Sequence, residues 1–315
     1  MEFRGLNIFI NKIMKIHIMM PMIHIHELQW NIHTCYYQAT VTDQRLILSC
    51  EREDKGMAKP ELKSYHVDGM DSRGFLNTYF DTNSGFKDET VGFIMEKLHS
   101  ALTTGQIKGD TLIDISIGSI VHQLFVVFEF FKEITILKLS ESCIMELNKW
   151  VNTRTGAFDW KYAFKTITDL QGNSAAAQKK EEKLKETIKR ILKFDFCNKN
   201  LTDPEVLPPA DCLLTAWVLD VVSQDQQEYI RNMRKVLKLL KPGGYLIVIG
   251  VLNGTYFTVA NQRLHIFPYD ESFIRKTLTD EGCEIVSCEL LDRTVDSDLT
   301  DYKQFMVLNA VKGNC

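Results

Sequence analysis

One short segment constrains the fold of this chain more than any other. It runs Thr111-Leu-Ile-Asp-Ile-Ser-Ile-Gly118-Ser119, so an apolar run reaches an aspartate, passes through a glycine and enters a segment with apolar residues at helical spacing. This pattern predicts a strand, a loop and a helix. When such a loop follows a buried parallel strand, it faces the edge of the sheet where nucleotide-like ligands bind. Because only one glycine is present instead of a glycine-rich fingerprint, an ordinary turn explains the segment equally well.

The rest of the chain after Phe75 alternates between strand and helix patterns. Besides the strand in the segment above, the predicted strands are 133–138, 162–170, 211–217, 245–249, 283–291 and 305–311. The predicted helices begin at Asp88, at Ser119 and Ser140 as N-caps, and cover 175–193, 229–240 and 270–282. This alternation predicts a doubly wound, mostly parallel α/β sheet of seven strands.

Residues 1–69 differ in composition from the rest of the chain. They contain five of the eight histidines and six of the eleven methionines, without a sustained helical or strand period. An apolar run at 16–26 suggests either a signal peptide or a metal-binding tract. The histidines and Pro21 argue against the first, and the lack of a defined ligand geometry argues against the second. We therefore predict a poorly ordered extension, followed by one folded domain at 70–315.

The overall composition excludes several classes of protein. The net charge of -4 among 315 residues gives no basic surface for nucleic acid. Eight cysteines without a CxxC pattern predict reduced thiols in a cytoplasmic protein and no metal site. No apolar run approaches the roughly 20 residues that a membrane-spanning helix needs. We expect a monomer that binds neither a membrane nor nucleic acid.

Several segments, in a fixed order, resemble a known family. The turn Leu240-Lys-Pro-Gly-Gly-Tyr-Leu246 is similar to one found throughout class I S-adenosylmethionine-dependent methyltransferases. More specific matches are Gly156-Ala-Phe-Asp-Trp160, Asp169-Leu-Gln-Gly172, Lys180-Glu-Glu-Lys-Leu184 and Leu207-Pro-Pro-Ala-Asp-Cys212. Together they resemble the N-methyltransferases for nicotinamide, indolethylamine and phenylethanolamine, the first two most closely. The resemblance covers Met70 to Lys312 and implies a Rossmann-like domain with an N-terminal helical lid, S-adenosylmethionine as cofactor, and a small amine or pyridine as acceptor.

The resemblance assigns cofactor contacts, and several of them depart from the family. The family's D-I-G-S-G-P is Asp114-Ile-Ser-Ile-Gly118-Ser119 here, so Ser116 stands where a glycine lets the backbone approach the cofactor. The family's ribose-binding aspartate is Lys138, a donor without an acceptor. Its long stem either extends into solvent or stays in the site. The other positions that the resemblance assigns to the cofactor are Phe75, Tyr79, Phe80, His122, Asp195 and Phe196.

The acceptor positions are also only partly kept. Asp220 matches the family, whereas a second substrate-contacting aspartate is Gly250, and the aromatic pair is Tyr256-Phe257. Without the resemblance, core packing explains Tyr79, Tyr256 and Phe257 equally well. We expect Gly250 to weaken the binding of an amide or cationic acceptor, and Gly250→Asp to restore it. No residue is assigned a catalytic role, because methyl transfer to a neutral nitrogen depends mainly on holding two reactants in line.

The sequence supports three functional hypotheses. The first is an S-adenosylmethionine-dependent N-methyltransferase of the nicotinamide and indolethylamine type, with weakened cofactor binding. The second is a catalytically inactive relative that acts as a binding or regulatory protein. The third is an oxidoreductase in which Lys138 meets the 2′-phosphate of NADP, which the missing G-x-G-x-x-G disfavours.

Overall fold

The computed structural model describes residues 28–32, 35–42, 45–51, 62–103, 107, 109–172 and 177–314. The chain forms two compact units, Met1–Pro60 and Glu61–Cys315. In the first unit, for which the sequence predicted no strands, β1 (Leu28–Ile32), β2 (Cys35–Thr42) and β3 (Arg45–Glu51) form an antiparallel sheet in the order β1-β2-β3. The second unit begins at Glu61, before the boundary predicted at Met70.

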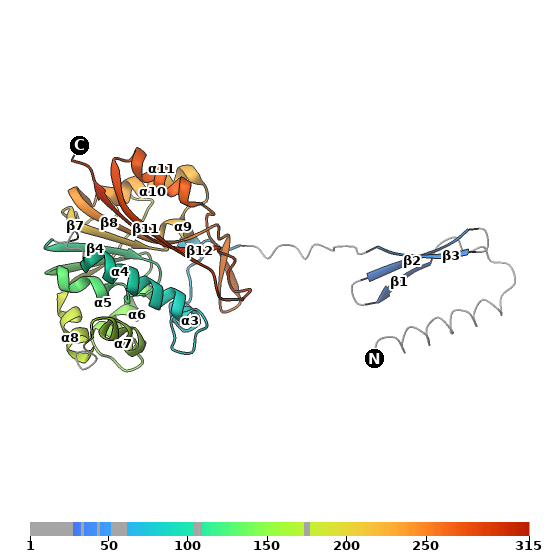
Figure 1. The fold of residues 1–315 in the computed structure, drawn as a ribbon, viewed down its shortest axis with the longest axis horizontal. Coiled ribbons are helices and arrows are strands. Elements are labelled where there is room, and N and C mark those ends of the chain that lie inside the picture. The colour runs from blue at the N-terminus through green and yellow to red at the C-terminus, as the bar shows by residue number, and fades with distance from the viewer. Residues whose placement is uncertain are drawn as a thin grey trace. The chain divides into compact units, whose positions relative to one another are not determined.

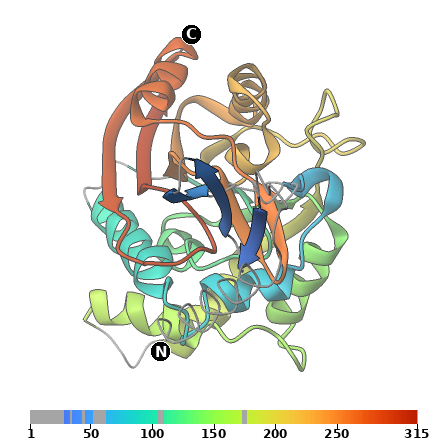
Figure 2. The same cartoon turned by 90° about the vertical axis from the view of Figure 1, so that its right-hand side faces the viewer.

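The second unit is built on a seven-stranded sheet in the order β11-β12-β8-β7-β4-β5-β6. The five strands from β8 to β6 are parallel: β8 (Leu240–Leu252), β7 (Ala210–Ala216), β4 (Thr111–Ser116), β5 (Glu133–Lys138) and β6 (Ile188–Lys193). The terminal pair β11 (Cys283–Asp292) and β12 (Gln304–Lys312) is antiparallel and includes one edge of the sheet (Figure 2). These strands confirm the predicted doubly wound, mostly parallel α/β fold.

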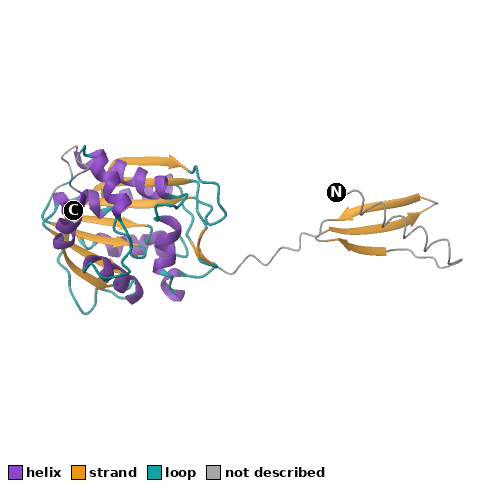
Figure 3. Ribbon diagram, turned by 90° about the horizontal axis from the view of Figure 1, so that it is seen from below, coloured by secondary structure: helices purple, strands orange, loops and turns teal. Residues whose placement is uncertain are grey.

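Helices cover both faces of this sheet (Figure 3). On one side lie α4 (Ile94–Thr103), α5 (Leu124–Val127) and α7 (Lys161–Leu170), and on the other lie α10 (Gln226–Leu237) and α11 (Glu271–Asp280) (Figure 1). The remaining helical elements are α2 (Tyr65–Asp68), α3 (Ser72–Tyr79), η1 (Asp88–Phe93), η2 (Phe128–Phe130), α6 (Glu141–Val151), α8 (Ala177–Thr187) and α9 (Leu219–Val222). A two-stranded ribbon, β9 (Tyr256–Val259) and β10 (Gln262–His265), completes the described elements.

The chain order of the strands reverses between β4 and β7. From β4 the chain proceeds outward to β5 and β6, whereas β7 and β8 are added on the opposite side of β4. In doubly wound sheets, ligands bind at the carboxyl ends of the strands beside such a reversal. The loops after β4 and β7 therefore lie where a ligand site is expected.

Three local predictions were wrong. The segment predicted as strand 162–170 is the helix α7, because Ala163, Phe164 and Ile167 form a buried face at helical spacing. The third parallel strand is β6, at the end of the charged segment that was predicted to be wholly helical. Ser119 does not cap a helix, since its hydroxyl donates to the carbonyl oxygen of Cys143 at 2.9 Å. By contrast, Ser140 accepts a hydrogen bond from the amide of Cys143 at 3.3 Å and caps α6 as predicted.

Candidate functional site

A buried polar network closes the carboxyl end of β4. The hydroxyl of Ser116 donates to Oδ1 of Asp114 at 2.7 Å. The Gln123 amide donates to the same oxygen at 2.9 Å and to the Ser116 hydroxyl at 3.1 Å. All three side chains are almost completely buried. A buried carboxylate needs such donors, because burial without them costs several kcal/mol (about 1–3 for each unsatisfied group).

Lys138, at the end of β5, completes this network. Its Nζ donates to the carbonyl oxygen of Ser116 at 3.0 Å and lies 3.7 Å from Oδ2 of Asp114. Only 1% of Lys138 is exposed, so of the two orientations open to its stem it takes the inward one. Burial raises the pKa of Asp114 and lowers the pKa of Lys138, and the attraction between the two groups opposes both shifts. We call Asp114, Ser116, Gln123 and Lys138 the polar network.

The loop after β4 is covered by residues 65–80, which we call the entry segment. The amide of Gly118, which has a φ of +55°, donates to the Tyr65 hydroxyl at 3.1 Å. A Cβ atom at Gly118 would lie 3.0 Å from the Phe75 ring and 3.1 Å from Met70. Glycine is therefore required here by both the left-handed backbone and the close approach of the entry segment.

His122 follows this loop and lies among aromatic rings. Its ring centroid is 5.0 Å from that of Phe80, 5.9 Å from that of Trp160 and 6.2 Å from that of Trp217. Burial lowers the pKa of His122 to about 3, and neither ring nitrogen has a hydrogen-bond partner among the described residues. The imidazole is therefore neutral at physiological pH and acts as a packing group.

Asp195 and Phe196 lie after β6 and do not belong to the polar network. Asp195 is exposed, and its Oδ1 accepts a hydrogen bond from the amide of Cys197 at 2.7 Å. Phe196 is half-buried, and its ring packs edge-on against that of Phe194 at a centroid distance of 5.2 Å. The carboxylate of Asp195 retains free acceptor capacity toward solvent.

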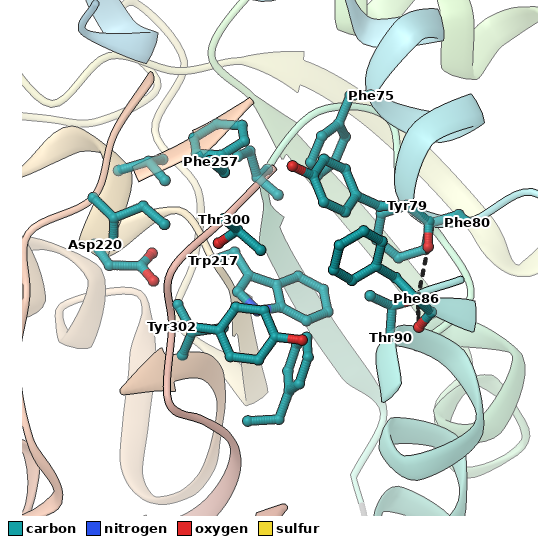
Figure 4. A pocket seen from close by; sticks show the side chains of 15 residues that line it. Phe75, Tyr79, Phe80, Phe86, Thr90, Trp217, Asp220, Phe257, Thr300 and Tyr302 are labelled. Carbon is teal, nitrogen blue, oxygen red and sulfur yellow. Dashed lines mark hydrogen bonds between the residues drawn. The ribbon is translucent and has the colours of Figure 1, made fainter. Parts of the chain in front are cut away.

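An aromatic cavity of about 60 Å³ lies between the entry segment, the loops after β4 and β7, and β12 (Figure 4). The predicted residues Phe75, Tyr79, Phe80, Asp220 and Phe257 line it, whereas Asp195 and Phe196 do not. Eight rings contribute to its wall: Phe75, Tyr79, Phe80, Phe86, Trp217, Phe257, Tyr302 and Phe305. These rings come from segments far apart in the chain, so the cavity exists only in the folded domain.

Among the described residues that line this cavity, Asp220 is the one with a charged side chain. It is 2% exposed, and its Oδ2 has no hydrogen-bond partner among the described residues. Burial raises the pKa of Asp220 to about 7, although the backbone amides of Asp220, Val221 and Val251 favour its ionised form. The carboxyl is therefore available as a hydrogen-bond acceptor beside an apolar space.

Two predicted acceptor residues lie elsewhere. Tyr256 packs under Arg263, whose guanidinium carbon is 4.3 Å from the ring centroid, and its hydroxyl donates to the Asp298 carbonyl oxygen at 3.1 Å. At Gly250, a Cβ atom would lie 2.3 Å from the Tyr269 hydroxyl oxygen. Tyr269 thus fills the space that a side chain at 250 would need, so Gly250→Asp alone cannot restore an acidic group as we expected.

Two residues of the site, Trp217 and Glu89, were not predicted from the sequence. Trp217 follows β7 directly and has a φ of +51°. Its position at the end of a predicted strand was the feature of the sequence that could have identified it. Glu89 is buried in η1 and accepts hydrogen bonds from the amides of Thr294 at 2.6 Å and Val295 at 3.0 Å, and from the Tyr302 hydroxyl. No local pattern identifies Glu89, because its partners lie at the other end of the domain sequence.

Within the described ranges, no group of three or more His, Cys, Asp or Glu side chains is arranged to hold a metal ion. A search of those same residues also finds no helix that is long and apolar enough to cross a membrane.

Comparison with known proteins gives a family. Residues 61–313 match the model of the NNMT/PNMT/TEMT family. The chain is 36% identical to indolethylamine N-methyltransferase of Oryctolagus cuniculus, over 68% of this chain and 82% of that protein. It is 30% identical to nicotinamide N-methyltransferase of Homo sapiens, over 79% of this chain and 96% of that protein. Magnesium protoporphyrin IX methyltransferase from Synechocystis PCC 6803 superposes with a TM-score of 0.48 at 14% identity, over 79% of this chain and 93% of that one.

Proposed function

This chain belongs to the NNMT/PNMT/TEMT family, and on that premise we propose that it transfers a methyl group from S-adenosylmethionine to the nitrogen of a small amine or pyridine. The observation that supports an amine acceptor most directly is the aromatic cavity beside the reversal of strand order, with the Asp220 carboxyl at its wall. Such a cavity excludes water and holds a small ligand, and Asp220 accepts an N–H from it. S-adenosylmethionine supplies the methyl group when it is bound.

The residues at the carboxyl edge fit this cofactor unequally. Asp195 is exposed and has a free acceptor oxygen, which supports a contact with the amino group of adenine. Lys138 is buried and donates to the Ser116 carbonyl oxygen. Asp114 accepts hydrogen bonds from Ser116 and Gln123 through Oδ1, whereas its buried Oδ2 has only the ion pair with Lys138 at 3.7 Å. A ribose at the end of β5 would meet the Lys138 ammonium group at the position where the family has a carboxylate. The polar network therefore does not fit the ribose in this conformation.

We accordingly propose that cofactor binding is weak. A ribose hydroxyl that loses its acceptor costs about 1–3 kcal/mol, and each ~1.4 kcal/mol lowers affinity tenfold. Lys138 adds a second cost, because its side chain must leave the polar network before a ribose hydroxyl can occupy its position. Ser116 adds a side chain at the point where glycine would let the backbone approach the ligand.

Calorimetric titration of the full chain with S-adenosylmethionine and S-adenosylhomocysteine tests the proposal. We expect weak binding, tighter binding in Lys138→Asp, and still tighter binding when Ser116→Gly is added. Lys193→Asp is the matched control, because Lys193 also ends a parallel strand but its side chain is 57% exposed. Parent affinity equal to that of the human nicotinamide enzyme, measured side by side, would contradict weak binding. Methyl transfer is then followed with labelled cofactor and a panel of amines and pyridines.

The polar network favours a second candidate function. A catalytically inactive protein that keeps the fold and binds another ligand needs no cofactor at the end of β5, and the buried Lys138 and Asp114 offset each other's charge as an ion pair at 3.7 Å without one. Absence of cofactor binding in both the parent and the double variant would favour this candidate.

We further propose that the protein is a cytoplasmic monomer whose methyltransferase domain functions without residues 1–60. Cys143, Cys197, Cys212, Cys283 and Cys288 are free thiols, as expected in a reducing compartment. Light scattering during size-exclusion chromatography tests the oligomeric state, and fluorescence microscopy of the tagged full chain tests the location.

A further inference from the structure

The hydroxyl groups around the aromatic cavity are all committed as donors to the protein itself. Tyr79 donates to the Thr258 carbonyl oxygen at 2.9 Å, and Thr90 donates to the Tyr79 carbonyl oxygen at 2.8 Å. Thr300 donates to the Tyr256 carbonyl oxygen at 2.9 Å, and Tyr302 donates to Glu89. A ligand carbonyl or carboxylate would therefore find no free hydroxyl among the described lining residues, and the indole N–H of Trp217 is the donor that is left. One donor cannot satisfy a carboxylate, and burying such a group without its other partners weakens its binding.

The cavity instead offers what a cation needs. Its wall consists mainly of aromatic rings, whose faces attract positive charge, and no Lys, Arg or His lines it. Oδ2 of Asp220 is buried and has no hydrogen-bond partner among the described residues. A ligand with one positive charge would pair with this carboxylate and lie against the rings, and a ligand that also has an N–H would donate it to Oδ2.

The volume of the cavity limits the size of such a ligand. An apolar cavity of about 150 Å³ holds benzene, and a single water needs roughly 10–15 Å³ by the same measure. The aromatic cavity measures about 60 Å³, which is too small for a six-membered ring. It corresponds to about four or five non-hydrogen atoms.

We propose that the aromatic cavity binds a small methylated ammonium ion, of the size of trimethylammonium or tetramethylammonium, with Asp220 as its counter-charge. This inference rests on the proposed function in one respect only: the proposed function identifies the cavity as the place where the acceptor binds. It departs from the cyclic compounds named for the relatives, because a pyridine or indole ring requires a larger space than this cavity provides.

Calorimetry and saturation-transfer NMR of the full chain, without cofactor, test the inference with trimethylamine hydrochloride and tetramethylammonium chloride. We expect both ions to bind, and acetate and tert-butanol of similar size to bind at least tenfold more weakly. Asp220→Asn should weaken the ammonium ions at least tenfold, and Phe257→Leu several-fold. Glu284→Gln, which removes an exposed acid on β11, should leave their binding unchanged.

The possible outcomes separate this inference from the proposed function. Equal affinity in the parent and in a folded Asp220→Asn variant would overturn the inference, as would binding of nicotinamide or tryptamine without binding of the small ions. A protein that binds the ammonium ions but transfers no methyl group retains this inference and loses the proposed function. A protein that methylates pyridines but does not bind the ammonium ions retains the proposed function and loses this inference.

Discussion

The replacement Lys138→Met tests whether the buried ion pair holds the carboxyl edge of the sheet together. Methionine has nearly the length of lysine but no charge, so it removes the hydrogen bond from Nζ to the Ser116 carbonyl oxygen (3.0 Å) and the ion pair with Asp114 (3.7 Å). Removing one partner of a buried pair costs about 3–5 kcal/mol. Asp114 keeps its hydrogen bonds from Ser116 and Gln123, so we expect the lower end, about 3 kcal/mol at pH 7.

The pH dependence of this loss distinguishes charge from packing. In the variant, Asp114 can escape its unpaired charge by taking up a proton, and from the reference pKa of 3.8 this costs about 4 kcal/mol at pH 7 but less than about 2 kcal/mol at pH 5. The loss in unfolding free energy should therefore be smaller at pH 5. Asp114→Asn/Lys138→Met should cost less than the sum of its single changes, because the pair is removed as a unit.

Urea unfolding of the parent, the two single variants and the double variant measures these differences. Lys132→Met is the matched control, since Lys132 pairs with Asp110 at 2.8 Å but its side chain is 76% exposed, and we expect no measurable change there. Our reasoning fails if Lys138→Met unfolds at the same urea concentration as the parent. An equal loss at pH 5 and pH 7 would show that packing, and not the ion pair, accounts for the effect.

Three other predictions concern the cavity and the entry segment. Burial raises the pKa of Asp220 from 3.8 to about 7, so the folded state binds the proton more tightly than the unfolded state. The titratable groups that interact with Asp220 are the Tyr229 and Tyr269 hydroxyls. The unfolding free energy should therefore fall as pH rises from about 4 to about 7, by about 4 kcal/mol, and thermal unfolding of Asp220→Asn should lack this component. Gly250→Asp should lower the melting temperature, because its side chain clashes with the Tyr269 hydroxyl, and it should not raise acceptor affinity. Adding Tyr269→Phe should relieve the clash, since the Cζ atom of the ring would lie 3.6 Å from the new Cβ atom. An unchanged melting temperature in the single variant would contradict this. Removing residues 1–60 should leave the melting temperature unchanged, but removing the first 69 residues should lower it, because Tyr65 is 3% exposed and accepts the Gly118 hydrogen bond; equal melting temperatures for the two truncated chains would count against a role for Tyr65.

The sequence by itself determined six of the seven strands of the sheet and the edge where a ligand is expected. Apolar runs such as 111–116 and 133–138 form buried strands wherever they lie in a doubly wound domain, and N-cap signals such as Ser140 act within a few residues. The segment 162–170 was assigned wrongly because a short apolar run fits either a strand or a helix, and only its packing against neighbouring elements selected the helix. The sequence also showed that Lys138 stands where the family has an aspartate, and that Lys138 lies at the end of a strand.

Only the tertiary structure decided what these residues do. A lysine at a strand end can extend into solvent or turn inward, and here Asp114 and the Ser116 carbonyl oxygen, both more than twenty residues earlier, hold it inward. The aromatic cavity likewise has no local signal, because its rings approach one another only when the entry segment and β12 close over the loops after β4 and β7. Long side chains and rings interact through space and not along the chain, so their partners depend on the packing of distant elements.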